Sequence, residues 1–224
     1  MSAFLLLTTE RFFAHRQWLL RDRTGEGQIL LRDEDLSKAR LSGCDFRYAE
    51  LSRCSFAGAI VNYSTFEGAS LEDCAFAAAD FGHSTFDLGR LSMCVFRLSD
   101  LTRSTFWRSA IRSCDFEAAD LTESHFGDAD SEDVTFEGSR LRKAQLDKGR
   151  FRGCNFRNAD LKTGLTRETH FEDCDFSGAN FEGRNLNGTV FSRCKFAGST
   201  GTPVIEGPIQ ITDPDIAPAW ARRT

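Results

Sequence analysis

Apolar residues recur at every fifth position over most of this chain. The positions that run from Leu31 to Phe196 in steps of five number 34, and 32 of them hold Leu, Phe, Val or Ile; the exceptions are Ser131 and Thr166. Neither an α-helix, with 3.6 residues per turn, nor a strand, whose side chains alternate, keeps this spacing on one face. A fixed repeat of this length predicts a solenoid, in which each unit packs against its neighbours.

The residue two positions before each of these is small. From residue 34 onward it is Ala, Cys, Ser, Gly, Thr or Val, except at Glu34 and Arg184. The other three positions of each five are mostly polar. We therefore expect one large and one small inward side chain per five residues, which fills a narrow core.

The cysteines give the length of one coil independently. Seven of the eight fall on a grid of twenty residues, Val134 occupies the one gap, and a Phe follows each of the seven two positions later. We expect about twenty residues per coil, with these cysteines stacked in one inward column. They are Cys54, Cys74, Cys94, Cys114, Cys154, Cys174 and Cys194.

A three-residue pattern recurs in which Ala is followed by Asp or Asn and then by Leu. It occurs as Ala119, Asp120 and Leu121, and again as Ala159, Asp160 and Leu161. This pattern, together with the period of five, resembles the pentapeptide-repeat family. The resemblance covers about three quarters of the chain and implies an all-β fold, a right-handed quadrilateral β-helix with one pentapeptide per side. We expect this β-helix to cover residues 31–200.

The two ends lie outside the repeat. Residues 1–30 are expected to form an N-terminal cap, either a helix from Thr8 or Thr9 to about Arg23 or a strand-like segment over residues 4–7. Residues 201–224 hold all four prolines and are expected to form an extended C-terminal cap or tail. Val204, Ile209 and Ile211 are placed to close the last coil, and Trp220 to pack there or on a partner chain.

Two faults interrupt the core pattern. At Ser131 the large residue is lost, and we expect the larger Val134 to refill part of the space. At Thr166 we expect the neighbouring Leu165 to turn inward instead. No loop is inserted between residues 31 and 200.

The cysteines also bear on the compartment. The spacing contains no C-x-x-C pair, and side chains that point the same way into a core are expected to stay as buried, reduced thiols. Reduced thiols favour a reducing compartment. A signal peptide needs a positive charge before its apolar run, and none precedes the first apolar run here. No stretch is long enough to cross a membrane. We expect a cytoplasmic protein.

Catalysis is not expected. The histidines His15, His83, His125 and His170 form no cluster with cysteine or carboxylate at ligand spacing, and there is no Gly-rich phosphate loop or nucleophile motif. A β-helix also presents flat or convex faces rather than a cleft. We predict a non-enzymatic protein with no cofactor and no metal site.

Charges alternate along the twenty-residue grid in the second half of the chain. Opposite charges directly across neighbouring strands support each other by about 0.2 to 1 kcal/mol. Three columns are predicted to pair in this way: Arg112, Glu132, Arg152 and Glu172; Arg103, Glu123 and Lys143; and Arg108, Asp128, Lys148 and Glu168.

Residues 61–107 break that alternation. Asp80, Asp87 and Asp100 have no cation one coil away, and exposed apolar residues occupy outward positions beside them, which is typical of an interaction surface. The alternative is that the aspartates hold turns and that single exposed apolar residues are normal. The predicted partner surface consists of Asp80, Asp87, Asp100, Leu88, Met93, Leu98 and Trp107.

Among pentapeptide-repeat proteins, a compact rod with a net negative charge, here −5, and Phe-rich sides resembles the Qnr-type quinolone-resistance branch. That resemblance implies a DNA-mimicking rod that binds DNA gyrase or topoisomerase IV and protects it from poisons. It implies a protein partner, without direct contact to nucleic acid or membrane. The alternative is a generic protein–protein interaction scaffold or effector module with no topoisomerase role. A homodimer through a terminal segment is a further option.

Overall fold

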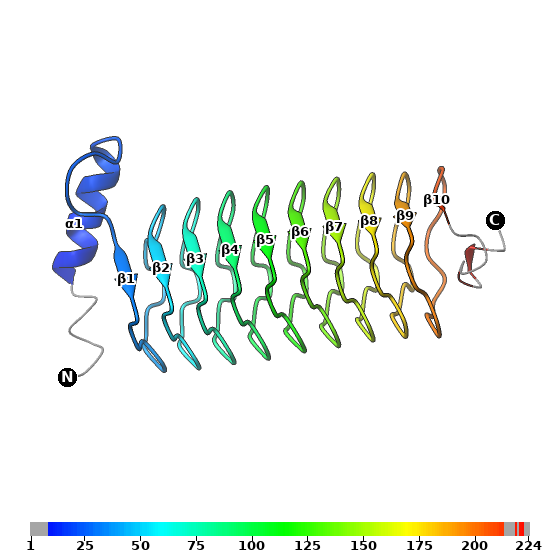
Figure 1. Cartoon of the computed structure of the whole chain (residues 1–224), viewed down its shortest axis with the longest axis horizontal. Coiled ribbons are helices and arrows are strands. Elements are labelled where there is room, and N and C mark those ends of the chain that lie inside the picture. The colour runs from blue at the N-terminus through cyan, green and yellow to red at the C-terminus, as the bar shows by residue number, and fades with distance from the viewer. Residues whose placement is uncertain (1–8, 213–217, 219, 222–224) are drawn as a thin grey trace.

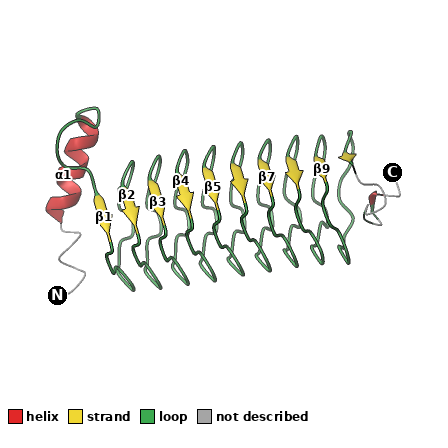
Figure 2. Ribbon diagram, in the orientation of Figure 1, coloured by secondary structure: helices red, strands yellow, loops and turns green. Residues whose placement is uncertain are grey.

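The structure, a computed structural model, describes residues 9–212, 218 and 220–221. One helix, α1 (Thr9–Leu20), is followed by ten short parallel strands that form a single sheet in sequence order (Figures 1 and 2). The strands are β1 Leu30–Arg32, β2 Glu50–Ser52, β3 Ser70–Glu72, β4 Arg90–Ser92, β5 Ala110–Arg112, β6 Asp130–Glu132, β7 Arg150–Arg152, β8 His170–Glu172, β9 Val190–Ser192 and β10 Gln210–Ile211.

Each strand pairs with the next in a register of twenty residues, so that Leu91 lies beside Ile111 and Phe151 beside Phe171. The chain is a right-handed, four-sided β-helix, as predicted from the sequence. The twenty-residue grid of the cysteines is therefore the length of one coil.

Each coil has four sides. Side 1 carries the strands, and sides 2, 3 and 4 are held by rows of single parallel bridges that start at Asp35, Arg40 and Asp45. From Leu31 to Phe196, the central residue of each side is buried, except the half-buried Leu41, and the residues before and after it are mostly exposed or half-buried. At the end of each side one residue has a positive φ, for example Gly43 at 68° and Tyr63 at 57°, and these residues form four edges along the rod.

Phenylalanine rings fill the interior in stacked columns. Phe96 lies parallel to Phe116 with ring centroids 4.7 Å apart, and Phe106 lies parallel to Phe126 at 4.5 Å. Rings of adjacent columns meet edge to face, as Phe106 and Phe116 do at 5.9 Å. Offset stacks and edge-to-face contacts are the favoured arrangements of aromatic rings, so the periodic Phe pattern specifies the core directly.

All eight cysteines are free, and seven are buried while Cys44 is half-buried. The buried thiols follow one another in one column, which Val134 interrupts between Cys114 and Cys154. The neighbouring Cys74 thiol and burial together raise the pKa of Cys54 far above its ordinary range. The Cys54 thiol is thus held in the unreactive protonated form.

The helix α1 covers the N-terminal end of the rod. Phe12 packs edge to face on Phe46 at 5.3 Å, and Arg11 donates a hydrogen bond to the Leu30 carbonyl at 2.7 Å. His15 is fully buried: its Nδ1 accepts the Ile29 N–H at 3.1 Å, and its Nε2 lies 2.9 Å from the Arg47 carbonyl. Burial lowers the pKa of His15, so this hydrogen-bonded cap favours the neutral ring. Of the two alternatives for residues 1–30, the helix is the one that the described residues form; residues 4–7 lie outside them.

The last coils are covered by the C-terminal segment. β10 extends the sheet beyond β9, Ile209 and Ile211 pack partly buried against the core, and Val204 joins the row of bridges on side 4. The indole of Trp220 lies 5.3 Å from Phe181 and 5.9 Å from Phe196. Trp220 therefore packs on its own core rather than presenting itself to a partner chain.

The prediction that Leu165 replaces Thr166 in the core is wrong. Leu165 is only half-buried, Thr166 is buried, and the space around it is filled from the next coil by the guanidinium of Arg184. Arg184 is fully buried and donates hydrogen bonds to Thr166 Oγ1 and to the carbonyls of Leu141, Ala144, Leu161 and Leu165. A Cβ on residue 164 would lie 2.3 Å from this guanidinium, so Gly164 is needed to admit it.

The two exceptions to the pattern, Thr166 and Arg184, therefore compensate each other. Burial lowers the pKa of Arg184 to about 9, so its side chain stays cationic at neutral pH. Its charge is met by carbonyl dipoles and a hydroxyl, and no carboxylate of the described residues is hydrogen-bonded to it. At the other fault, Ser131 and Val134 are both buried.

Candidate interaction surface

Ion pairs between neighbouring coils cover the outward positions of the second half of the rod. Arg103 and Lys143 both contact Glu123, at 2.8 and 3.0 Å, and lower its pKa. Arg112 and Arg152 both pair with Glu132 at 3.3 Å, and both also reach Asp130. Two of the three predicted charge columns thus form ion pairs, although Glu172 pairs with Arg193.

The third predicted column forms differently. The indole Nε1–H of Trp107 donates to Asp128 at 3.2 Å, and the Arg108 guanidinium lies 4.3 Å over the Trp107 ring. Arg108 and Asp128 therefore do not pair with each other. The prediction of an Arg108–Asp128 ion pair is wrong because it left out the aromatic neighbour, which offers a cation–π contact to one and a hydrogen bond to the other.

No ion pair in the described part of the chain involves any residue between 54 and 96. Residues 54–140 contain fifteen Asp and Glu against six Lys and Arg, a net charge of −9. Residues 141–200 contain seven acids against eleven bases, a net charge of +4. The modest charge of the whole chain hides a strongly acidic middle and a basic C-terminal part.

Three aspartates stack directly on one another on side 3. Asp80 pairs by a backbone bridge with Asp100, and Asp100 with Asp120. Of these three aspartates, only Asp120 has a cation partner among the described residues, because Arg140 lies 3.1 Å from it. Asp80 is held by the N–H of Gly82 at 3.0 Å and by the amide of Asn62 at 2.6 Å, and Asp100 by the N–H of Thr102 at 2.9 Å. These bonds fix the carboxylates without neutralising their charge.

The register places the seven predicted surface residues around the rod. Asp80 and Asp100 lie on side 3, with Leu98 at the edge between sides 2 and 3. Asp87 and Trp107 lie one coil apart on side 4, where the backbone N–H of Trp107 donates to Asp87 at 2.8 Å. Leu88 lies at the edge between sides 4 and 1. Met93 lies at the edge between sides 1 and 2, diagonally opposite the edge that sides 3 and 4 share.

That shared edge carries two aromatic residues that the sequence prediction did not place on the surface as a pair. The rings of Tyr63 and His83 are stacked with centroids 4.8 Å apart and planes 8° from parallel, and Tyr63 is 65% exposed. The signal was present, because residues 63 and 83 are one coil apart. A hollow of about 250 Å³ adjoins the pair on side 3, lined by His83, Thr102, Arg103, Thr122 and Glu123.

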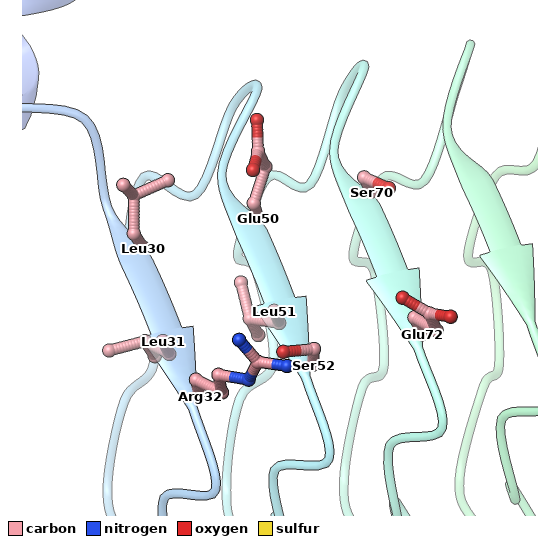
Figure 3. A pocket seen from close by; sticks show the side chains of 8 residues that line it. All are labelled: Leu30, Leu31, Arg32, Glu50, Leu51, Ser52, Ser70 and Glu72. Atoms are coloured by element: carbon pink, nitrogen blue, oxygen red, sulfur yellow. The ribbon is translucent and has the colours of Figure 1, made fainter.

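A second hollow, of about 350 Å³, lies on side 1 near the N-terminal end and is shown in Figure 3. Its lining comes from β1, β2 and β3, and Figure 3 shows Arg32, Glu50 and Glu72 on three successive strands. The lining includes no histidine, cysteine or lysine that could serve as base or nucleophile beside these acids. This hollow is an outer surface of the sheet and carries no recognisable catalytic arrangement.

Within the described residues, no group of three or more His, Cys, Asp or Glu side chains is placed to hold a metal ion. In the same part of the chain, no helix has the length and apolar content that a membrane crossing needs.

The chain belongs to the pentapeptide-repeat family. The family model for pentapeptide repeats matches in eight copies, over residues 35–73, 114–153, 136–162 and 167–200. Among curated protein sequences, none matches this chain significantly.

Two solved structures illustrate the likeness. HetL, a pentapeptide repeat protein involved in heterocyst differentiation regulation from the cyanobacterium Nostoc sp. strain PCC 7120, is 15% identical, with a TM-score of 0.59 over 94% of this chain and 99% of that one. QnrB1, a plasmid-mediated fluoroquinolone resistance protein, is 17% identical, with a TM-score of 0.46 over 88% and 97%. At such identities the likeness to HetL shows the fold alone.

Proposed function

We propose that this protein is a non-enzymatic, DNA-mimicking ligand of a DNA-binding protein, and that a type II topoisomerase such as DNA gyrase is its partner. The observation that carries the proposal is the net charge of −9 on residues 54–140. These residues fill about four and a third coils, or about 21 Å at the ~4.8 Å separation of neighbouring strands. One net charge per ~2.3 Å approaches the one per ~1.7 Å of duplex DNA.

The arrangement of the charges supports the same proposal. Duplex DNA presents fixed charges on a rod, and here the stacked Asp80 and Asp100 are fixed by hydrogen bonds on a rigid backbone. We infer that the contact surface lies on sides 3 and 4 and the edges that bound them. Of the predicted residues it includes Asp80, Asp87, Asp100, Leu88, Leu98 and Trp107, and it leaves out Met93.

The test is the effect of the purified chain on gyrase. We expect it to inhibit supercoiling, or to restore supercoiling in the presence of a poison, at micromolar or lower concentration. The effect should weaken with added salt, because exposed charges are screened within about 8 Å at physiological ionic strength. Reversing Asp87 and Asp100 to Lys should abolish it, whereas reversing Glu168, an unpaired acid in the basic part, should not.

A supercoiling effect that survives the double reversal would reject this surface. No effect on gyrase or on topoisomerase IV at any concentration would reject the topoisomerase proposal and favour the alternative, an interaction scaffold with another partner. That alternative draws on the exposed Tyr63 and Leu98, which electrostatic mimicry of DNA does not require. Eight free cysteines favour a reducing compartment, and we keep the cytoplasm as the proposed location.

A further inference from the structure

The edge between sides 3 and 4 offers an unfilled position in a stack of planar groups. Successive coils place Gly43, Tyr63, His83 and Arg103 along this edge. Tyr63 and His83 are stacked, and the Arg103 guanidinium is fixed by Glu123 at 2.8 Å. At Gly43 the sequence supplies no side chain, and among the described residues no atom lies within 4 Å of a Cβ built there. In this part of the chain, no side chain of the edge therefore covers the face of Tyr63 that is turned away from His83.

Side 3 next to this edge has the other features of a docking surface. The hollow of about 250 Å³ lies against His83 and is floored by Thr102 and Thr122. Leu98, which is 69% exposed, marks the far edge of the same side. Between the two edges lie the carboxylates of Asp80 and Asp100, which no cation in the described residues pairs with.

We propose that this surface docks an arginine-bearing segment of a protein partner. A guanidinium is planar, stacks on aromatic rings and pairs with carboxylates, so one Arg side chain can use both the open Tyr63 face and the neighbouring acids. A lysine ammonium can pair with the carboxylates but cannot stack on the Tyr63 ring as a planar guanidinium does. The proposal rests on the proposed function, because a protein that binds DNA presents Arg and Lys to the phosphates.

Charge complementarity selects this occupant over two others. The acidic surface repels a nucleic acid. A second copy of this chain offers its basic residues 141–200, but five of the seven arginines there are already paired with acids, as Arg142 is with Asp160 at 2.5 Å, and Arg184 is buried, which leaves Arg150. A partner with unpaired arginines is the better match.

The experiment compares a nonaarginine with a nonalysine peptide by isothermal titration calorimetry on the full chain. We expect nonaarginine to bind about two- to five-fold more tightly, which is the range of one exposed cation–π contact. The variant Tyr63→Ala should bind both peptides equally, and Asp80→Asn with Asp100→Asn should weaken both. Thr163→Ala, on the same edge five coils further on, is the matched control and should keep the preference. Equal binding of the two peptides to the unaltered chain would overturn the proposal.

A second measurement separates this proposal from the proposed function. If gyrase responds equally to the unaltered chain and to Tyr63→Ala, the docking surface is overturned and the gyrase function stands. If Tyr63 governs the arginine preference but gyrase does not respond, the docking surface stands and the gyrase function fails. A dimer at low salt that Tyr63→Ala disperses, seen by sedimentation, would assign the surface to a second copy and overturn the proposal. The melting temperature of each variant verifies folding, which an exposed position is expected to preserve.

Discussion

The coils of residues 54–140 and those of residues 141–200 share one backbone and one aromatic core, but they use their outward positions differently. In the C-terminal coils acids pair with arginines 20 residues later or 18 residues earlier in the chain, as Asp147 does with Arg167 and Asp175 with Arg157. Among residues 54–140 the described ion pairs begin only at Arg97, and the stacked neighbours of Asp80 and Asp100 are Ile60, each other and Asp120. The Arg193 guanidinium lowers the pKa of Asp173, a response that opposite charges at one coil's spacing produce.

This difference shows which arrangements of outward charge stabilise the fold and which do not. With a strict repeat of twenty, each outward side chain faces the side chains twenty residues before and twenty residues after it. Alternating charge along such a column is therefore the stable arrangement. Like charges stacked on a rigid rod are destabilising, so the acidic coils lose stability that the C-terminal coils retain. Residues that break a local rule without a structural gain are expected at functional sites. The acidic coils are therefore the better candidate for binding.

The largest expected effect tests what the two regions share. Phe96→Ala and Phe176→Ala each remove a fully buried or nearly fully buried ring that stacks on a neighbour in the adjacent coil, at 4.7 and 4.9 Å. Each should lower the free energy of unfolding by about 3 to 5 kcal/mol, because the flanking coils cannot close the cavity. Urea denaturation measures the loss. A loss below about 1 kcal/mol for either ring would show that the core is not common to both regions.

The next effect is confined to the C-terminal coils, where Arg184 takes a core position. Arg184→Ala should cost about 2 to 5 kcal/mol, because it leaves a cavity at Gly164 and Thr166 and removes hydrogen bonds to buried carbonyls. Arg184→Met keeps most of the volume and should cost about 1.5 kcal/mol or less, since it also avoids burying a charge. Chemical denaturation of both variants checks this order. If Met costs as much as Ala, the guanidinium hydrogen bonds stabilise these coils more than its volume does.

Arg184 also shows the limit of the sequence prediction. The repeat, the coil length, the β-helix and two charge columns could be predicted, because each depends on residues five or twenty apart. The pairing of Thr166 with Arg184 could not, since it joins two different positions of side 4 in neighbouring coils, 18 residues apart. The sequence marked both positions as exceptions but gave no measure of which side chain reaches the other.

The candidate surface was predicted in part for the same reason. Unpaired acids such as Asp80 and Asp100 can be found by counting twenty residues, and the stack of Tyr63 on His83 follows from the same count. To assign the predicted surface residues to the four sides, the edges of the coil must first be located. The positions of the edges show that Met93 lies apart from the other six residues. Contacts such as Arg108 on Trp107 depend on side-chain conformation, which a periodic pattern does not specify.

The smallest expected effect concerns two aspartates in the same column of side 3, whose replacement by Asn should change the free energy of unfolding in opposite directions. Asp100 stacks between Asp80 and Asp120, whereas Asp160 is paired with Arg142 at 2.5 Å. In both, Oδ1 accepts the N–H two residues on, from Thr102 and from Lys162, and an Asn side chain can keep that bond. Asp100→Asn should therefore raise the free energy of unfolding by about 0.2 to 1 kcal/mol, because it removes like-charge repulsion. Asp160→Asn should lower it by a similar amount, because it removes an ion pair.

Denaturation at low and high salt measures both changes in one experiment. Screening should shrink the two differences together, because both arise from exposed charges on a rigid backbone. If Asp100→Asn destabilises the protein as Asp160→Asn does, the acidic stack is not under repulsion, and the contrast between the two regions loses its energetic basis. If Asp100→Asn stabilises the protein and also weakens its effect on gyrase, stability and binding oppose each other at one residue, as expected for a charge retained for a partner.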